Sequence, residues 1–251
     1  MQAFQHNLIV VLLVSLRVVP TLAFSPPFTL VRVPATVRLV LCLALSGWMV
    51  AGHPDQTTAV DLDALGYVAV AVSELVIGIA LALALQFAFA ALLTVGRTID
   101  LQAGYAFAMI ADPSSRTQMP LIGMIFAYAA AAVFFSTSAP GDLLAIWSLS
   151  LDHLPLGAAI SADAVPVLAS YIASAFVLAF GGGGLLLLVL LLIDGAIALV
   201  SRTLPQMNVL FLGFQVKAIV TLVLLPIAIA GSATLFLRMI RFALETMTRI
   251  A

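Results

Sequence analysis

Charged residues are scarce in this sequence, and their scarcity excludes most soluble folds. Of 251 residues, 8% are charged and 64% are hydrophobic, and the mean hydropathy is +1.24. Globular proteins carry about 25% charged and about 45–50% apolar residues. A water-soluble core cannot hide this much apolar surface, so we expect an integral membrane protein or part of a large hydrophobic assembly. The net charge of −1 provides no basic field for nucleic acid.

Residues that commonly carry chemistry are equally sparse. Cys42 is the single cysteine, which excludes a disulfide framework and a cysteine-based metal site. The three histidines lie far apart and form no His-x-x-x-His pattern. Phosphate-binding and zinc-protease motifs are missing, and no histidine in a later apolar helix could serve a serine nucleophile. We therefore predict a protein that is not an enzyme and that needs no cofactor.

The N-terminus also lacks the basic residues of a secretory signal. Met1 to Asn7 contains no lysine or arginine, and Arg17 interrupts the apolar run that follows. A secretory signal begins with a positively charged segment. We therefore expect a retained first membrane helix.

Long apolar runs are what the sequence has in abundance. About 20 helical residues cross a roughly 30 Å hydrocarbon core, and runs of this length are too long for strands. The predicted fold is all-α, a single membrane domain over residues 1–251 with about six long apolar helices. The runs are Leu8–Phe24, Thr36–Val50, Leu65–Leu93, Leu121–Phe135, Val167–Val200 and Val209–Leu237. Gly181–Gly184 interrupts the fifth run, either as a break in the helix or as a close-packing face.

Loop charges give a conflicting membrane topology. Arg32 and Arg38 place the first loop in the cytoplasm by the positive-inside rule, and the acidic loops 55–63 and 142–163 fall outside. The arginine-bearing tail 238–251 would then also fall outside, against the same rule. Either one of these loop assignments is wrong, or the segments do not all cross the membrane.

The stretch from Gly96 to Pro120 gathers charge, glycine, proline and small polar residues between two apolar blocks. Such a stretch persists in a membrane protein where it lies in water, in a protein-lined cavity or in a pore. We interpret it as a gate. Arg97 and Asp100 are spaced i, i+3, so they either pair on one helix face or solvate a helix end. Gly104, one turn on, permits close backbone approach.

The second half of this stretch combines a turn signal with soft apolar residues. Asp112 and Pro113 are typical of a turn or a helix start. Met109 and Ile110 precede them and are either part of a deformable seal or simply core.

Isolated charges inside the apolar runs have two interpretations. Glu74 is either a functional acid, such as a proton relay or a partner for a cation, or one half of a helix-packing ion pair. The same alternatives apply to Arg17, Asp194 and Lys217. Asp194 and Arg202 are eight residues apart and would lie loosely on one side of a continuous helix.

Two blocks of residues resemble one family. The first block contains Glu74, Gly78, Gly96, Asp100, Gly104 and Asp112-Pro113; the second contains Ser201-Arg202, Pro205-Gln206, Asn208, Phe214 and Lys217. Together they resemble the R/T-type export-gate subunit of type III secretion, called FliR in flagella, over nearly the whole chain. By this resemblance Glu74, Arg97, Asp100, Gly104, Arg202, Pro205, Gln206, Asn208 and Lys217 are expected to be buried polar or assembly contacts.

The resemblance implies a fold and an assembly. Residues 1–150 would form a P-type-like half and residues 151–251 a Q-type-like helical hairpin, with tilted hairpins in a larger helical complex. The partners would be the P-type and Q-type subunits (FliP and FliQ), the switch subunit FlhB and the export protein FlhA, in the bacterial inner membrane. Unfolded flagellar or effector proteins would pass through the pore. The plug that closes it would comprise Met109, Ile110, Asp112, Pro113, Ser114, Ser115, Arg116 and Gln118.

The sequence also departs from the family. Pro140-Gly141-Asp142 stands where relatives often carry glycine and histidine, and the fifth long run has no proline. A second hypothesis, from another functional class, is a secondary transporter, because glycine-interrupted membrane helices mark transporter sites.

Overall fold

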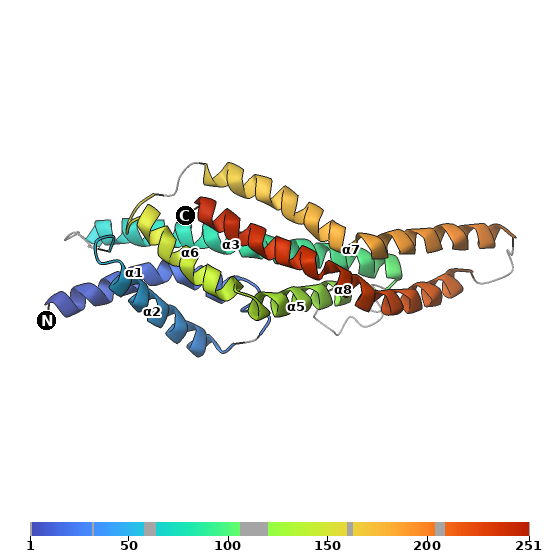
Figure 1. Cartoon of the computed structure of the whole chain (residues 1–251), viewed down its shortest axis with the longest axis horizontal. Helices are drawn as coiled ribbons and strands as arrows, with labels where there is room; N and C mark the ends of the chain where they lie inside the picture. Colours follow the sequence, from blue (N-terminus) through green and yellow to red (C-terminus); the bar gives the residue numbers. More distant parts are fainter. Residues whose placement is uncertain are drawn as a thin grey trace. The chain divides into compact units, whose positions relative to one another are not determined.

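The structure is a computed structural model of the chain and describes residues 2–31, 33–57, 64–105, 120–159, 163–203 and 209–250. All regular secondary structure in these ranges is helical, which confirms the all-α prediction (Figure 1). The helices are α1 (Gln2–Phe24), α2 (Ala35–Gly52), α3 (Ala64–Ala103), α5 (Leu121–Ser136), α6 (Ala139–His153), α7 (Ala164–Thr203) and α8 (Val209–Ile250).

The chain folds into two compact units, each built from separate stretches. Unit 1 contains residues 1–88, 134–173 and 240–251, and unit 2 contains residues 89–133 and 174–239. Helices α3, α7 and α8 contribute to both units. The division into halves 1–150 and 151–251 came from the family resemblance and stays a prediction.

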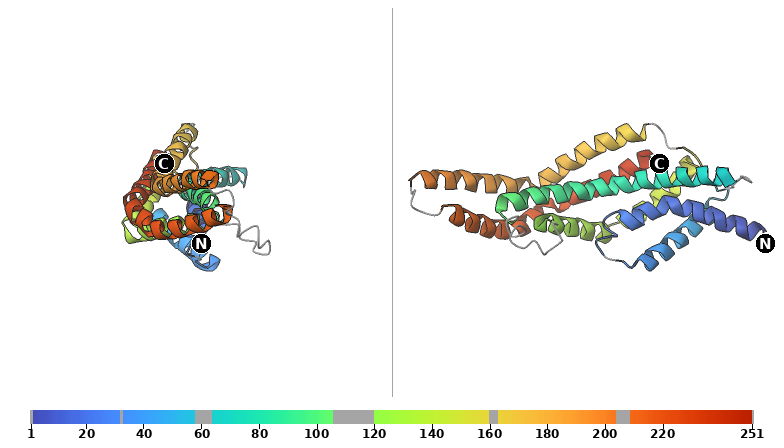
Figure 2. Two further views of the ribbon diagram at one scale, coloured as in Figure 1. Left: turned by 90° about the vertical axis from the view of Figure 1, so that its right-hand side faces the viewer. Right: turned by 180° about the vertical axis from the view of Figure 1, so that it is seen from behind.

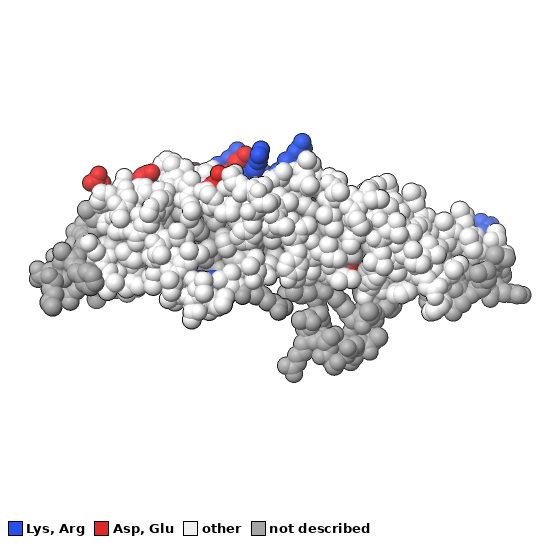
Figure 3. All heavy atoms as spheres, turned by 60° about the horizontal axis from the view of Figure 1, so that its bottom comes forward, with Lys and Arg blue, Asp and Glu red and all other residues white. Residues whose placement is uncertain are grey.

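Three helices are far longer than a bilayer requires. Helices α3 and α7 have 40 residues each and α8 has 42. At about 1.5 Å per residue each extends for roughly 60 Å, about twice the hydrocarbon thickness. Among the described residues, five helices are long and apolar enough to cross a membrane, or six if α5 and α6 together form one broken span. Figure 3 shows a face on which uncharged surface dominates.

Helix α3 corrects the expected start of the polar stretch. The apolar run predicted a helix over Leu65–Leu93, but α3 continues to Ala103. Thr94 and Thr98 hydrogen-bond the carbonyls of their own preceding turns, and no proline interrupts the sequence from there to Gly104. The polar residues up to Asp100 therefore lie on the last turns of α3 rather than in a loop after it.

Helix α6 occupies residues expected to form a loop. Helix α5 ends at Ser136, and Ala139-Pro140-Gly141-Asp142 forms the first turn of α6, where the missing N–H of the proline costs nothing. The Asp142 carboxylate accepts from the Ser138 hydroxyl at 3.0 Å. The predicted loop over residues 142–163 is shorter than expected, because α6 runs to His153 and α7 begins at Ala164.

The four-glycine run lies inside α7 and does not interrupt it. Figure 1 shows the ribbon bending near its label without an intervening coil. A Cβ at Gly183 would lie 2.4 Å from Val95 Cγ1, and the Gly182 carbonyl accepts from the Ser232 hydroxyl at 3.0 Å. The run is thus a close-packing face, and the transporter hypothesis loses the broken helix on which it rested.

Helices α7 and α8 form an antiparallel hairpin within unit 2. Going along α7 from Gly182 to Ile197, contacts move backwards along α8 from Ser232 to Gly213. Both views in Figure 2 show the two ribbons as neighbours over this part. The hairpin fixes which polar residues of α7 can reach α8.

Unit 1 is held by close contact between α1 and α3. A Cβ at Gly78 would lie 2.6 Å from the Leu16 carbonyl oxygen and 2.9 Å from Arg17 Cα. Ser25 and Tyr171 donate to the carbonyls of Ala82 and Ala84 on α3. The backbone contact at Gly78 brings the charged residues one turn away within reach of each other.

Candidate functional site

An arginine–glutamate pair lies in the interior of unit 1. Arg17 on α1 and Glu74 on α3 are both 0% exposed. Arg17 donates from Nε to Glu74 Oε2 at 2.7 Å and from Nη2 to Oε1 at 2.9 Å. This bidentate arrangement, with two parallel hydrogen bonds, is the strongest geometry for a guanidinium and a carboxylate. Gly78 permits it, because the side chains can meet only where the two backbones approach closely.

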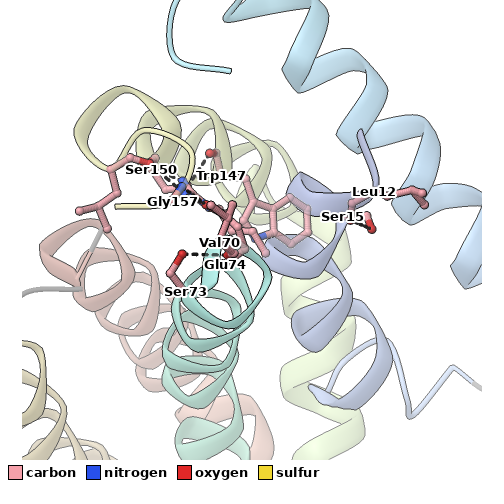
Figure 4. Close-up of polar contacts among 10 residues, drawn as sticks. Leu12, Ser15, Val70, Ser73, Glu74, Trp147, Ser150 and Gly157 are labelled. Atoms are coloured by element: carbon pink, nitrogen blue, oxygen red, sulfur yellow. Dashed lines mark hydrogen bonds and ion pairs between the residues drawn. The ribbon is translucent and has the colours of Figure 1, made fainter. Parts of the chain in front are cut away.

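The rest of this network comes from α6 and the turn after it (Figure 4). Arg17 Nη1 donates to the carbonyl of Ser150 at 2.8 Å, and Nη2 donates to the carbonyl of Leu154 at 2.9 Å. The Gly157 amide donates to Glu74 Oε1 at 3.1 Å. Both carboxylate oxygens are engaged, so the pair fits the helix-packing interpretation of Glu74 better than a proton relay.

The sequence singled out Arg17 and Glu74 but not the residues around them. Leu154 takes part through its backbone carbonyl and Gly157 through its amide, so their side chains carry no sign of the contact. Gly157 adopts φ of +84°, which favours glycine, and this is the one signal that the sequence offered.

In unit 2, Asp100 connects the end of α3 to the start of α5. Its carboxylate oxygens accept from the Ile122 amide at 3.2 and 3.3 Å, and Asp100 is 2% exposed. The first amides of a helix have no intrahelical partner and favour a negative group. Arg97 is exposed, and no ion pair joins it to Asp100 among the described residues. Of the two alternatives, the i, i+3 pair is not formed: Arg97 is exposed near the end of α3, and Asp100 caps the start of α5.

Gly96 on α3 and Gly123 on α5 bring these two helices into backbone contact, and Gly104 allows a close approach to α8. A Cβ at Gly96 would lie 2.0 Å from Gly123 Cα, a distance no side chain could tolerate. Gly104 ends α3 with φ of +90°, and its amide donates to the Asp100 carbonyl at 3.0 Å. A Cβ there would also lie 2.5 Å from the Phe214 ring. Gly104 thus combines a helix end with the close approach predicted for it.

Tyr105, just beyond α3, is tied to α8. Its hydroxyl donates to the carbonyl of Ala218 at 2.9 Å. Burial, and then the negative charge of Asp100, raise the pKa of this hydroxyl above its usual range, so it remains a donor. Tyr105 and Ile122 therefore fix both flanks of residues 106–119 to unit 2.

The predicted site residues Arg202 and Lys217 lie toward the end of the hairpin where α7 ends and α8 begins. Lys217 forms an ion pair with Asp194, so Asp194 pairs across the hairpin rather than along α7 with Arg202. Arg202 is exposed in the last turn of α7. Several predicted residues lie outside the described residues: Met109, Ile110, Asp112, Pro113, Ser114, Ser115, Arg116, Gln118, Pro205, Gln206 and Asn208.

Comparison with known proteins identifies the family. The sequence model of the bacterial export proteins, family 1, matches residues 8–243. The chain belongs to this family. Within the described residues, this export protein has no cluster of three or more histidine, cysteine, aspartate or glutamate side chains that could hold a metal ion.

Relatives of this export protein come from two kinds of system. It is 28% identical over 244 residues to the flagellar biosynthetic protein FliR of Bacillus subtilis, covering 95% of this chain and 93% of the relative. It is 29% identical to FliR of Escherichia coli, covering 79% and 76%. The Yop proteins translocation protein T of Yersinia pestis is 25% identical, covering 67% and 66%. The family resemblance stated from the two motif blocks is confirmed.

Proposed function

We propose that this chain is a non-enzymatic subunit of a type III protein export gate and forms part of its membrane pore. The family supports a role in the export apparatus, and the flagellar names among the relatives favour a flagellar system. The apolar helices support a membrane location, which we assign to the bacterial inner membrane. The cargo would be unfolded flagellar or effector proteins.

Residues 109–118 are the proposed plug of that pore. The observation that carries this proposal is the anchoring of both flanks, by Tyr105 on one side and by the capped start of α5 on the other. A stretch whose ends are fixed within one helical unit can close an opening and move aside without unfolding its support. A plug of apolar and small residues excludes water and ions while shut, as hydrophobic constrictions do.

The pore also needs partners. Many large apolar side chains of α3, α7 and α8 are exposed, among them Val72, Leu192 and Ile219. Exposed apolar area on this scale is covered by lipid or by other subunits. We propose the P-type and Q-type subunits, FlhB and FlhA as partners. Mass spectrometry of the detergent-extracted native complex would identify them, and a chain that extracts alone as a stable monomer contradicts this assignment.

The plug is tested by deletion of Ser114–Arg116. We expect the assembled complex to leak, measured as ion conductance in planar bilayers or as impaired growth when the chain is expressed with its partners. Loss of three residues shortens the stretch between fixed ends, so it can no longer fill the opening.

The matched control replaces Ser114–Arg116 with Gly-Ser-Gly, which preserves length. We expect this variant to conduct much less than the deletion. A deletion variant that assembles with its partners and remains ion-tight contradicts the plug.

A further inference from the structure

An apolar groove lies between α1 and α2 in unit 1. It encloses about 570 Å³, within the range of small-molecule sites, and its walls come from both helices. Leu12 and Leu43 lie at one end, and Ala23 and Ala35 lie at the end near the loop that joins the helices. From Leu12 to Ala23 the wall extends roughly 16 Å along α1 at about 1.5 Å per residue. This is a long, narrow shape suited to a hydrocarbon chain.

Among the described residues, Arg38 is the one cation that lines this groove, and it lies at the loop end. Arg38 Nη1 donates to the Ala23 carbonyl at 2.8 Å, in the last turn of α1. Arg38 Nε is buried, and no described residue accepts a hydrogen bond from it. A guanidinium stays charged at any physiological pH, and the partly exposed Arg38 side chain lines the groove. The groove therefore has an apolar body and a positive end.

The start of α2 adds to this positive end. Pro34 precedes the helix and supplies no side-chain cap, so the amides of the first turn have no side-chain acceptor there. Unsatisfied amides and the helix dipole favour an anion at this position. The Arg38 amide donates to the Pro34 carbonyl at 3.1 Å, so the Arg38 side chain begins at the same end of the helix as the first amides.

We propose that this groove binds a phospholipid with an anionic headgroup. One acyl chain lies between α1 and α2, and the phosphate pairs with the half-buried Arg38 guanidinium at the start of α2. The first residues of an apolar helix lie at the depth of the headgroups, where basic residues attract anionic lipids. The inference needs only a membrane location and holds whether or not residues 109–118 form a plug.

Cys42 makes the proposal measurable, since it lines the groove one turn beyond Arg38 and is the single cysteine of the chain; it is 3% exposed, so its alkylation reports opening of the groove. The test uses the detergent-extracted full-length protein with any subunits that accompany it. Dioleoylphosphatidylglycerol, dioleoylphosphatidylcholine or inorganic phosphate is added. Bound lipid is counted by native mass spectrometry, and Cys42 alkylation by N-ethylmaleimide is timed. We expect phosphatidylglycerol to be retained and to slow alkylation, with phosphatidylcholine weaker and inorganic phosphate without effect on alkylation.

Variants separate the two parts of the site. Arg38→Gln is expected to lower phosphatidylglycerol affinity about tenfold, since it removes a charged hydrogen bond. Val19→Trp is expected to fill the groove and exclude both lipids. Arg249→Gln removes the same charge at an exposed position and is expected to change nothing.

Three results would overturn the proposal. Equal retention of the two lipids would remove the headgroup recognition, and unchanged phosphatidylglycerol binding in Arg38→Gln would remove the role of the cation. Slow alkylation only when another protein subunit is present, with no lipid detected, would show that a polypeptide occupies the groove.

Discussion

The Arg17–Glu74 and Lys217–Asp194 ion pairs are built in opposite ways. In unit 1, Arg17 and Glu74 are both 0% exposed. In unit 2, the side chains of Lys217 and Asp194 are 18% and 41% exposed. The buried pair makes further hydrogen bonds to backbone groups of Ser150, Leu154 and Gly157. The first pair depends on the fold around it, whereas the second is within reach of solvent.

The difference shows why a charge in an apolar helix is not by itself a functional sign. Removing a charge from water costs several kcal/mol, and the cost is offset only when geometry and hydrogen bonds are complete. Unit 1 meets both conditions, so its pair fixes where α1, α3 and α6 meet. Removing one member of the buried pair in unit 1 should therefore cost much more stability than removing one member of the exposed pair in unit 2.

The largest effect is expected from Glu74→Gln. It leaves the buried Arg17 guanidinium without a counter-charge, and breaking such a pair costs about 3–5 kcal/mol. The free energy of unfolding in detergent, followed by circular dichroism during a denaturant titration, measures the loss. Glu245→Gln is the matched control, because Glu245 is exposed in α8 and its loss should cost less than about 0.5 kcal/mol.

A double substitution tests whether the pair acts as one unit. Arg17→Met combined with Glu74→Met replaces both charges by apolar side chains of similar length. We expect the double variant to lose less stability than the sum of the two single variants, because it leaves no unpaired buried charge. Simple additivity would mean that the two residues stabilise unit 1 independently.

The sequence predicted the helices well, since apolar runs of spanning length leave little choice of secondary structure. It placed the end of α3 too early and predicted a loop over most of α6, because polar residues and a proline are typical of loops. Arg97 and Asp100 could have formed a local pair, but the free amides at the start of α5 compete for the same carboxylate. Whether Asp100 binds Arg97 or the Ile122 amide depends on how α3 packs against α5. Residue spacing along α3 alone does not contain that information.

The glycine run shows the same limit. Four consecutive glycines predict either a break or a packing face, and sequence could not decide between them. The neighbours decide: Gly183 lies against Val95, whereas Gly184 has no atom within 4 Å of a Cβ position. Glu74 was likewise ambiguous until Arg17, 57 residues away, was seen to meet it.

An intermediate effect is expected from alanine in that run, within unit 2. Gly183→Ala would place its Cβ 2.4 Å from Val95 Cγ1, and overpacking of this kind costs about 1–3 kcal/mol. Gly184→Ala has open space and should stabilise the helix by about 0.5–1 kcal/mol, because alanine loses less backbone entropy than glycine. Thermal unfolding of the two variants measures both signs. Equal destabilisation would indicate that the run needs flexibility rather than close packing.

The smallest effect is expected from Lys217→Gln. The pair that Lys217 forms with Asp194 is partly exposed, and pairs of this kind contribute about 0–1 kcal/mol and weaken as salt screens them. The comparison becomes sharper when unfolding is measured at low and high salt, with Glu74→Gln in parallel. Salt should narrow the difference between Lys217→Gln and the parent while leaving the Glu74→Gln difference unchanged, because water and ions do not reach the interior of unit 1. A loss of several kcal/mol in Lys217→Gln at either salt concentration would place Asp194 in an apolar environment and remove the contrast between the two pairs.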